Sequence, residues 1–257
     1  MRIRRLGVSG LALVATLSVG VAGCNTQGGS GRPVASGVQE TSAAAQTPAE
    51  ALEASVKKLN EQSFTVSLHM SVMTASGGVD PVARKANLTM EIGLGDQSMD
   101  YQVITADEDV FLKFGGVPGM PKDWLRIDAA KIKEGSGLDV LPKDDPMGAN
   151  NLIKGIVEVS RDGERGFKGT MDLTKSPTAD AESMKMFGDK VTSVPFTART
   201  DEQGRLTEIS VNTKSVSPLL GEMRVAYDNF GKPVEIKTPD PSEVTEMPDE
   251  LLGLMNA

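Results

Sequence analysis

An apolar residue at every second position is the feature that most constrains what this chain can fold into. In residues 64–72, Phe, Val, Leu, Met and Val alternate with Thr, Ser, His and Ser. The same period recurs at 88–94, 99–103, 110–114, 167–173, 194–198, 207–211, 223–227 and 234–236. Because successive side chains of a β-strand point to opposite faces, each segment predicts a strand with one apolar and one polar face.

Turn sequences separate many of these segments. Asp, Asn or Gly marks 95–96, 107–109, 162–163, 201–204 and 229–231. Residues 122–128, which contain Trp124, predict one further short strand. Short turns between two-faced strands indicate an antiparallel meander with one face in water. A sheet of about nine to eleven strands does not stay flat, so we predict an α+β fold whose strongly curved antiparallel sheet forms a half-barrel.

The concave apolar face of such a sheet requires a cover, which we expect helices to provide. The clearest helix begins at Thr47, a capping residue, with Pro48 at the first helical position and Glu50 at the capping-box distance. Its apolar stripe is Leu52, Val56 and Leu59. Further helix candidates are 145–155, 178–187 and 241–255, the last with apolar side chains at Val244, Leu251, Leu252 and Met255.

The amino end predicts export. Residues 1–5 carry three arginines, and residues 6–21 form a short apolar run, which is typical of a secretory signal peptide. Cys24, the only cysteine, follows Val21-Ala22-Gly23 and resembles a bacterial lipobox, in which the thiol accepts a diacylglycerol and the lipidated residue carries chains such as palmitate. The alternative is a cysteine that lies by accident at the border of the signal peptide.

Residues 25–46 are rich in Gly, Ser, Thr, Ala and Gln and predict a flexible tether. The predicted organisation is therefore a lipoprotein signal peptide at 1–23, a tether from lipidated Cys24 at 24–46, and a single lipid-binding type of domain at 47–257. We expect a monomer on the outer face of the cytoplasmic membrane.

Charge and composition exclude several classes of protein. The chain has 27 Lys and Arg against 35 Asp and Glu, a net charge of -8. Loss of Arg2, Arg4 and Arg5 with residues 1–23 would make it more acidic still, so no nucleic-acid partner is expected. One cysteine and one histidine leave no disulfide framework and no Cys-based or multi-histidine metal site, and we expect no cofactor.

Candidate catalytic groups are weak, so we do not expect an enzyme. His69 falls on the polar face of its strand, and a Ser-His-Asp hydrolase would have to use it, yet no Gly-x-Ser-x-Gly motif occurs. The acidic run 107–109 could bind a cation, but a solvated hairpin turn is the better interpretation. Residues 115–119 are glycine-rich without the ending of a phosphate-binding loop.

Methionine is unusually frequent relative to the aromatic residues, with 13 Met against 7 Phe, 2 Tyr and 1 Trp. Its flexible thioether adapts to irregular apolar partners, although it also serves as ordinary core filler. A concave face lined by methionine and aliphatic side chains could accept acyl chains. The alternation and the helix stripes predict these lining residues: Val56, Leu59, Val66, Leu68, Met70, Met90, Ile92, Leu152, Ile153, Met184, Met186 and Phe187.

Together, the lipobox, the tether, the capped helix and the meander resemble the actinobacterial LppX/LprA/LprF/LprG lipoprotein family. The most similar segments are 52–72, 110–128 and 227–236. The family fold is like that of the LolA and LolB carriers, a half-barrel with helices over a hydrophobic cavity. The resemblance implies that the chain binds lipid or glycolipid acyl chains and carries them within the envelope, with an envelope transport protein as a possible partner. Cys24 is the only residue to which the resemblance assigns a specific role, that of the lipidated cysteine.

Two other functions remain open at this point. One is a non-enzymatic interaction or sensory lipoprotein of the same fold, with a collapsed cavity and an exposed surface that binds an envelope protein. The other is an exported hydrolase, which requires a catalytic group with a partner. Cavity volume and lipid that co-purifies with the chain distinguish the carrier from the interaction protein.

Overall fold

The computed structural model describes residues 46–95, 97–133, 136, 138–139, 141, 153–175 and 186–255. All of them fall within one compact unit, 44–257. The predicted signal peptide, Cys24 and nearly all of the tether lie outside the described residues. So do most of the helix candidates at 145–155 and 178–187.

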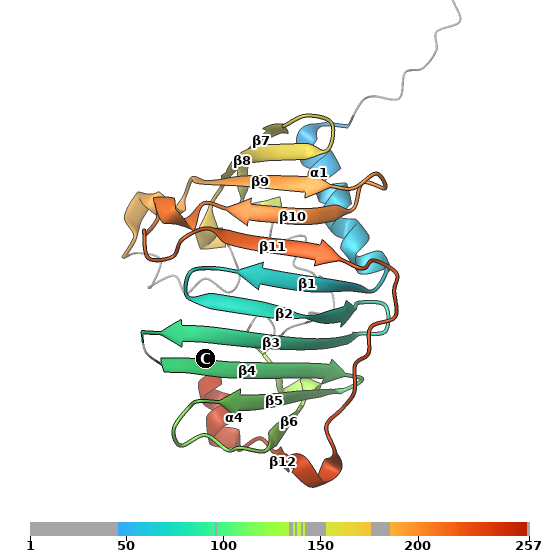
Figure 1. The fold of residues 1–257 in the computed structure, drawn as a ribbon, viewed down its shortest axis with the longest axis vertical. Helices are drawn as coiled ribbons and strands as arrows, with labels where there is room; N and C mark the ends of the chain where they lie inside the picture. Colours follow the sequence, from blue (N-terminus) through green and yellow to red (C-terminus); the bar gives the residue numbers. More distant parts are fainter. Residues whose placement is uncertain are drawn as a thin grey trace, which may run out of the picture. The chain divides into compact units, whose positions relative to one another are not determined.

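A single open sheet of twelve strands dominates the described part of the chain (Figure 1). Its strand order is β12-β6-β5-β4-β3-β2-β1-β11-β10-β9-β8-β7, and every pair is antiparallel except β12 with β6. The strands are β1 (Phe64–His69), β2 (Met73–Asp80), β3 (Lys85–Leu94), β4 (Gln97–Ala106), β5 (Asp109–Gly115), β6 (Trp124–Asp128), β7 (Ile156–Arg161), β8 (Gly166–Met171), β9 (Val194–Thr200), β10 (Leu206–Val211), β11 (Met223–Asp228) and β12 (Val244–Glu246).

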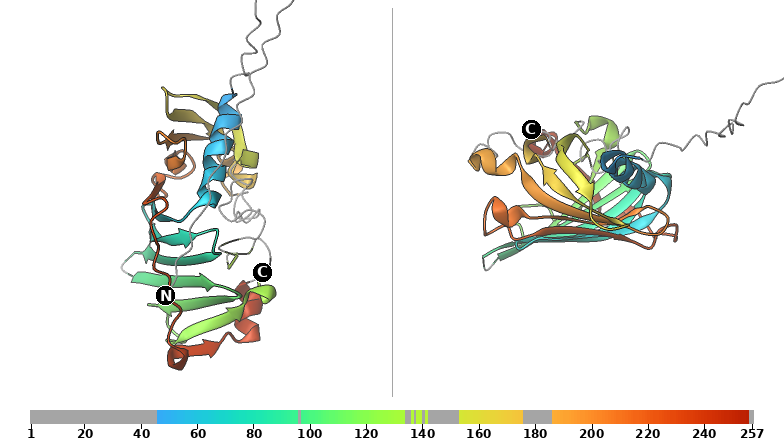
Figure 2. Two further views of the ribbon diagram at one scale, coloured as in Figure 1. Left: turned by 90° about the vertical axis from the view of Figure 1, so that its right-hand side faces the viewer. Right: turned by 90° about the horizontal axis from the view of Figure 1, so that it is seen from above.

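Helices are few in the described residues. The α-helices with described bounds are α1 (Pro48–Lys57) and α4 (Asp249–Met255), and residues 153–155, the end of the helix predicted at 145–155, are also helical. Short 3-10 helices are η1 (Lys58–Glu61), η2 (Ala129–Lys131), η3 (Leu173–Lys175), η4 (Gly188–Val191), η5 (Thr213–Ser215) and η6 (Pro241–Glu243). The sheet curves toward the side that carries α1 and α4 (Figure 2). The predicted α+β class and curved antiparallel sheet are confirmed, with one strand more than the upper end of the predicted range.

The strand register keeps the predicted apolar residues on one face across the sheet. Leu68 lies opposite Ala75, Ala75 opposite Met90, and Met90 opposite Tyr101. On the other side of β1, Leu68 lies opposite Val225 of β11. Because cross-strand partners share a face, the alternation of separate segments adds up to one continuous apolar face.

Several regions differ from the sequence prediction, among them β7 (Ile156–Arg161), for which no strand was predicted. No strand was predicted for residues 73–80, but they form β2, which pairs with β1 and β3. Its Gly77 lies where a Cβ would come within 1.8 Å of the Asn87 carbonyl oxygen, so only glycine fits this close approach. Residues 234–236 were predicted as a strand, yet they have no regular structure. The edge beside β11 is already occupied by β1, which leaves this segment no partner there.

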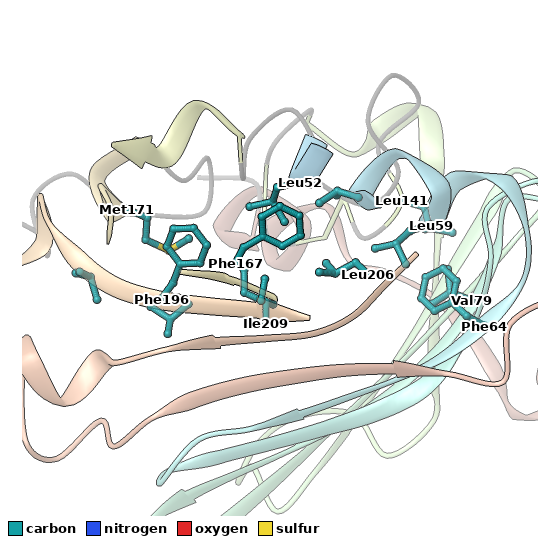
Figure 3. Close-up of a cluster of buried hydrophobic side chains, with 14 of the residues drawn as sticks. Leu52, Leu59, Phe64, Val79, Leu141, Phe167, Met171, Phe196, Leu206 and Ile209 are labelled. Carbon is teal, nitrogen blue, oxygen red and sulfur yellow. The ribbon is translucent and has the colours of Figure 1, made fainter. Parts of the chain in front are cut away.

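One buried cluster joins α1 to the β7–β11 side of the sheet and to the adjacent ends of β1, β2 and β3. Thr47 caps the helix, and the capping box with Glu50 is present as predicted. The helix turns Leu52 and Val56 inward, and Leu59 follows from η1. Figure 3 shows Leu52 and Leu59 above the strand residues of this cluster. Partners from the sheet are Phe64, Val79, Ala86, Phe167, Met171, Val194, Phe196, Ala198, Leu206, Ile209 and Val211.

A second buried cluster lies at the β4–β6 side of the same sheet. It contains Val103, Val110, Leu112, Leu125, Ile127, Leu138, Met247 and Leu252. Leu252 comes from α4, which begins only at Asp249, so the helix predicted from residue 241 is shorter than expected. Val244 lies instead in β12, which pairs with β6. The pairing of Val244 with Trp124 explains this difference, because it holds the residue in an extended conformation.

Candidate functional site

Between the two clusters, the apolar face carries a group of half-buried side chains that we call the methionine band. Its members are Leu68, Met70, Met73, Met90, Ile92 and Met99. In the register of β2, β3 and β4, Met73 lies opposite Ile92 and Ile92 opposite Met99. Met70 and Met73 close the β1–β2 hairpin through backbone hydrogen bonds, so they stand side by side at its turn.

The methionine band is less buried than the clusters on either side of it. Leu68, Ile92 and Met99 belong to neither buried cluster, whereas Met90 packs against the edge of the second one. Partly exposed aliphatic and thioether side chains on adjacent strands form an apolar surface that can adjust its shape to a ligand. The arrangement offers van der Waals contact to an apolar chain and has no ionisable member.

Aromatic side chains border the methionine band. Tyr101 lies opposite Met90, and its ring is 5.1 Å from that of Phe114. Burial raises the pKa of Tyr101 to about 12, because the phenolate is poorly solvated among these apolar groups. On the other side, Tyr227 lies 5.7 Å from Phe64 in an edge-to-face arrangement, and burial raises its pKa to about 12 as well. Both phenols therefore remain neutral at physiological pH.

Part of the predicted lining set comes together in the methionine band. Leu68, Met70, Met90 and Ile92 are members, and Val66 packs beside them at the edge of the first cluster. Met73 and Met99 were not in the predicted set. The alternation in 99–103 was a usable signal for Met99, whereas Met73 begins β2, a strand that sequence analysis did not predict.

The other predicted lining residues lie elsewhere. Val56 and Leu59 are fully packed within the first cluster, and Phe187 and Ile153 are half-buried. Met186 is 80% exposed, so it contributes little to any enclosed pocket. The remaining two, Leu152 and Met184, lie outside the described residues.

A separate open groove of about 770 Å³ lies on the polar face of β1, β2 and β11. The segment after β11 runs along this groove and is fastened by side-chain hydrogen bonds. Asn87 accepts from the backbone N–H of Gly78 at 2.7 Å and donates to the carbonyl oxygen of Glu235 at 3.3 Å. Asn229 donates to the Thr65 hydroxyl at 3.0 Å. Hydroxyl, amide and carboxylate side chains line this groove together with Val66, Pro233 and Val234, in contrast to the methionine band.

The candidate catalytic residues lie at the surface. His69 is exposed at the end of β1. The acidic run 107–109 forms the predicted turn, with Asp107 at a φ of 56°, and Asp109 pairs with Arg126 at 3.2 Å. Within the ranges that the structure describes, no group of three or more His, Cys, Asp or Glu side chains is arranged to hold a metal ion. Trp124 lies in β6, as expected, under the ammonium group of Lys113.

No protein-family model matches the chain, and no curated protein sequence matches it. Among the residues described, no helix combines the length and the apolar character needed to cross a membrane.

Proposed function

We propose that this chain is an exported lipoprotein, anchored through Cys24, that binds lipid or glycolipid acyl chains and carries them within the cell envelope. The observation that supports this proposal is the methionine band, a half-buried apolar surface on the concave face of the sheet. In this proposal the chain is not an enzyme, and helices cover the methionine band and part to load and release the lipid.

The energy of acyl-chain binding would come from removing methylene groups from water. Each buried methylene contributes about 0.8 kcal/mol, so a sixteen-carbon chain could gain roughly 10 kcal/mol before ordering costs. Methionine side chains follow the changing shape of a flexible chain better than rigid rings do. The absence of ionisable groups from the methionine band favours an alkyl tail over a charged headgroup there.

Native mass spectrometry of the full chain, purified from a host with a similar envelope, tests lipid binding. We expect an added mass that organic solvent releases and that identifies the lipid. Ile92→Asp should remove it, because a carboxylate in the apolar face disfavours an alkyl tail. Thr89→Asp is the matched control, since it places the same charge on the exposed polar face of the same strand.

If circular dichroism shows that both variants are folded and Ile92→Asp still retains the lipid, acyl binding at the methionine band is contradicted. A clean protein mass for the unaltered chain under gentle conditions would do the same. For the anchor, mass spectrometry of the amino-terminal peptide should show a diacylglyceryl cysteine at Cys24. Cys24→Ala should remove that modification and release the protein from the membrane fraction.

The polar groove supports a second candidate, the interaction lipoprotein. Its floor offers Thr65, Ser67 and Ser76, hydroxyl side chains suited to a polar ligand or a peptide segment. Ser76→Trp would block the groove without touching the apolar face. Loss of an envelope partner in cross-linking of this variant, with lipid content unchanged, would favour the interaction function.

A further inference from the structure

We propose that one end of the sheet docks on a lipid bilayer and forms the entrance through which acyl chains reach the methionine band. This inference rests on the proposed function and adds the place where lipid enters. Among the connections at this end of the sheet are the β1–β2 turn at 70–73, the loop after β5 at 115–121, and the connection between β10 and β11 at 212–222 (Figure 1).

Apolar side chains are exposed on these connections. Leu219 is 80% exposed and Val72 is 39% exposed. The two loops that carry them are in contact, because the Ser71 N–H donates to the Leu220 carbonyl oxygen at 3.4 Å. A large apolar side chain with this exposure on a loop tip gains free energy on entering the interface of a bilayer.

The exposed residues are continuous with the methionine band. Val72 lies between Met70 and Met73 in sequence, within the same turn. Its carbonyl oxygen accepts from the N–H of Gly93, next to Ile92 of the band. An acyl chain that leaves a bilayer at Val72 is therefore adjacent to Met70 and Met73 of the methionine band.

The tips of these loops are uncharged. Residues 70–73, 115–121 and 215–221 contain no ionisable side chain, and Lys214 and Glu222 lie at the two ends of the β10–β11 connection. The turns at the opposite end carry charges of both signs, such as Arg84 after β2, Asp107 and Glu108 after β4, and Glu164 and Arg165 after β7. An uncharged loop tip enters the interface of a bilayer more readily than a charged one, so a bilayer surface favours contact with these loop tips.

A polarity-sensitive fluorophore on a single introduced cysteine tests the docking. Leu219→Cys and Val72→Cys are prepared in the full chain and reconstituted in vesicles of equal parts phosphatidylcholine and phosphatidylglycerol. Val82→Cys is the matched control, because Val82 is a 69% exposed apolar residue in the turn between β2 and β3, at the opposite end. The unaltered chain, carried through the same labelling, reports any label on Cys24.

We expect the label at 219 and at 72 to shift to shorter wavelength and to be quenched from the lipid phase, and the label at 82 to stay in water. Leu219→Asp should slow transfer of a fluorescent phospholipid to acceptor vesicles about tenfold, because a carboxylate enters the interface poorly. It should leave lipid binding intact, since Leu219 is 80% exposed and belongs to neither buried cluster nor the methionine band.

Two results would overturn the docking. One is a label at 219 whose emission wavelength and lipid-phase quenching match those of the label at 82. The other is a rate of phospholipid transfer that is the same for Leu219→Asp and the unaltered chain. In both cases lipid bound in native mass spectrometry would leave the proposed function standing. A docked label at 219 in a protein that never retains lipid would support the docking and contradict the carrier function instead.

Discussion

Gly221 packs against Ser71 so closely that a Cβ on the glycine would lie 2.0 Å from the Ser71 hydroxyl oxygen. The glycine also has a φ of 70°, a left-handed conformation that side chains disfavour. This contact links the β10–β11 connection to the β1–β2 turn. It therefore holds together the two loops that carry the exposed apolar residues Val72 and Leu219.

Gly221→Ala should destabilise the protein by about 1–3 kcal/mol, from the left-handed backbone and the clash together. Urea unfolding followed by circular dichroism measures this. In the double variant with Ser71→Gly the clash is removed and only the backbone strain remains, so the loss should be smaller. Equal losses in both backgrounds would show that the contact with Ser71 contributes nothing.

Asn87→Ala should lower the free energy of unfolding by about 1–2 kcal/mol, because it leaves the buried N–H of Gly78 without its acceptor. It also removes a hydrogen bond to the segment that crosses the polar face, so amide hydrogen exchange should increase around residues 233–236. Thr89→Ala, on the same face of the same strand, is the control. A similar change in both variants would contradict the role of Asn87.

The two tyrosines predict the alkaline behaviour of the protein. Both have a pKa raised to about 12 by burial, against an ordinary value near 10. Because the folded pKa is higher, the phenols favour the folded state below pH 10, and this contribution is lost as pH rises from about 10 to 12. Tyrosinate absorbance should therefore appear near pH 12 in the folded chain and near pH 10 in urea.

Tyr227→Phe leaves Tyr101 as the remaining tyrosine, so its titration can be followed alone. Bound acyl chains next to Met90 should raise the Tyr101 midpoint further, because they remove more water from the phenol. A tyrosinate midpoint near 10 in the folded variant would contradict the burial of Tyr101 against Phe114.

Thr47→Ala should destabilise the protein by about 1 kcal/mol, because the Thr47 hydroxyl accepts from the Glu50 N–H at the start of α1. Thr47→Ser keeps the capping oxygen and serves as the control. Thermal unfolding of the three proteins compares them. No difference between the serine and alanine variants would mean that the cap adds nothing to the packing of Leu52 and Val56.

Sequence alone determined those elements whose signal is local. The two-residue period placed β1, β3, β4, β5, β8, β9, β10 and β11, since alternation reports directly which side chains share a face. The capping box at Thr47 likewise predicted the start of α1. Four members of the methionine band, Leu68, Met70, Met90 and Ile92, followed from the same alternation.

Only the tertiary structure decided which segments find a partner. Residues 73–80 contain Thr, Ser and two adjacent glycines, a weak strand signal, yet they form a central strand because β1 and β3 offer hydrogen bonds on both sides. Residues 234–236 alternate well but remain outside the sheet, since β10 and β1 already occupy both edges of β11. Val56 and Leu59, predicted to line a cavity, are enclosed by packing against strands more than a hundred residues away in the chain. Pairing and packing depend on which edges and surfaces are free, and a local pattern carries no information about that.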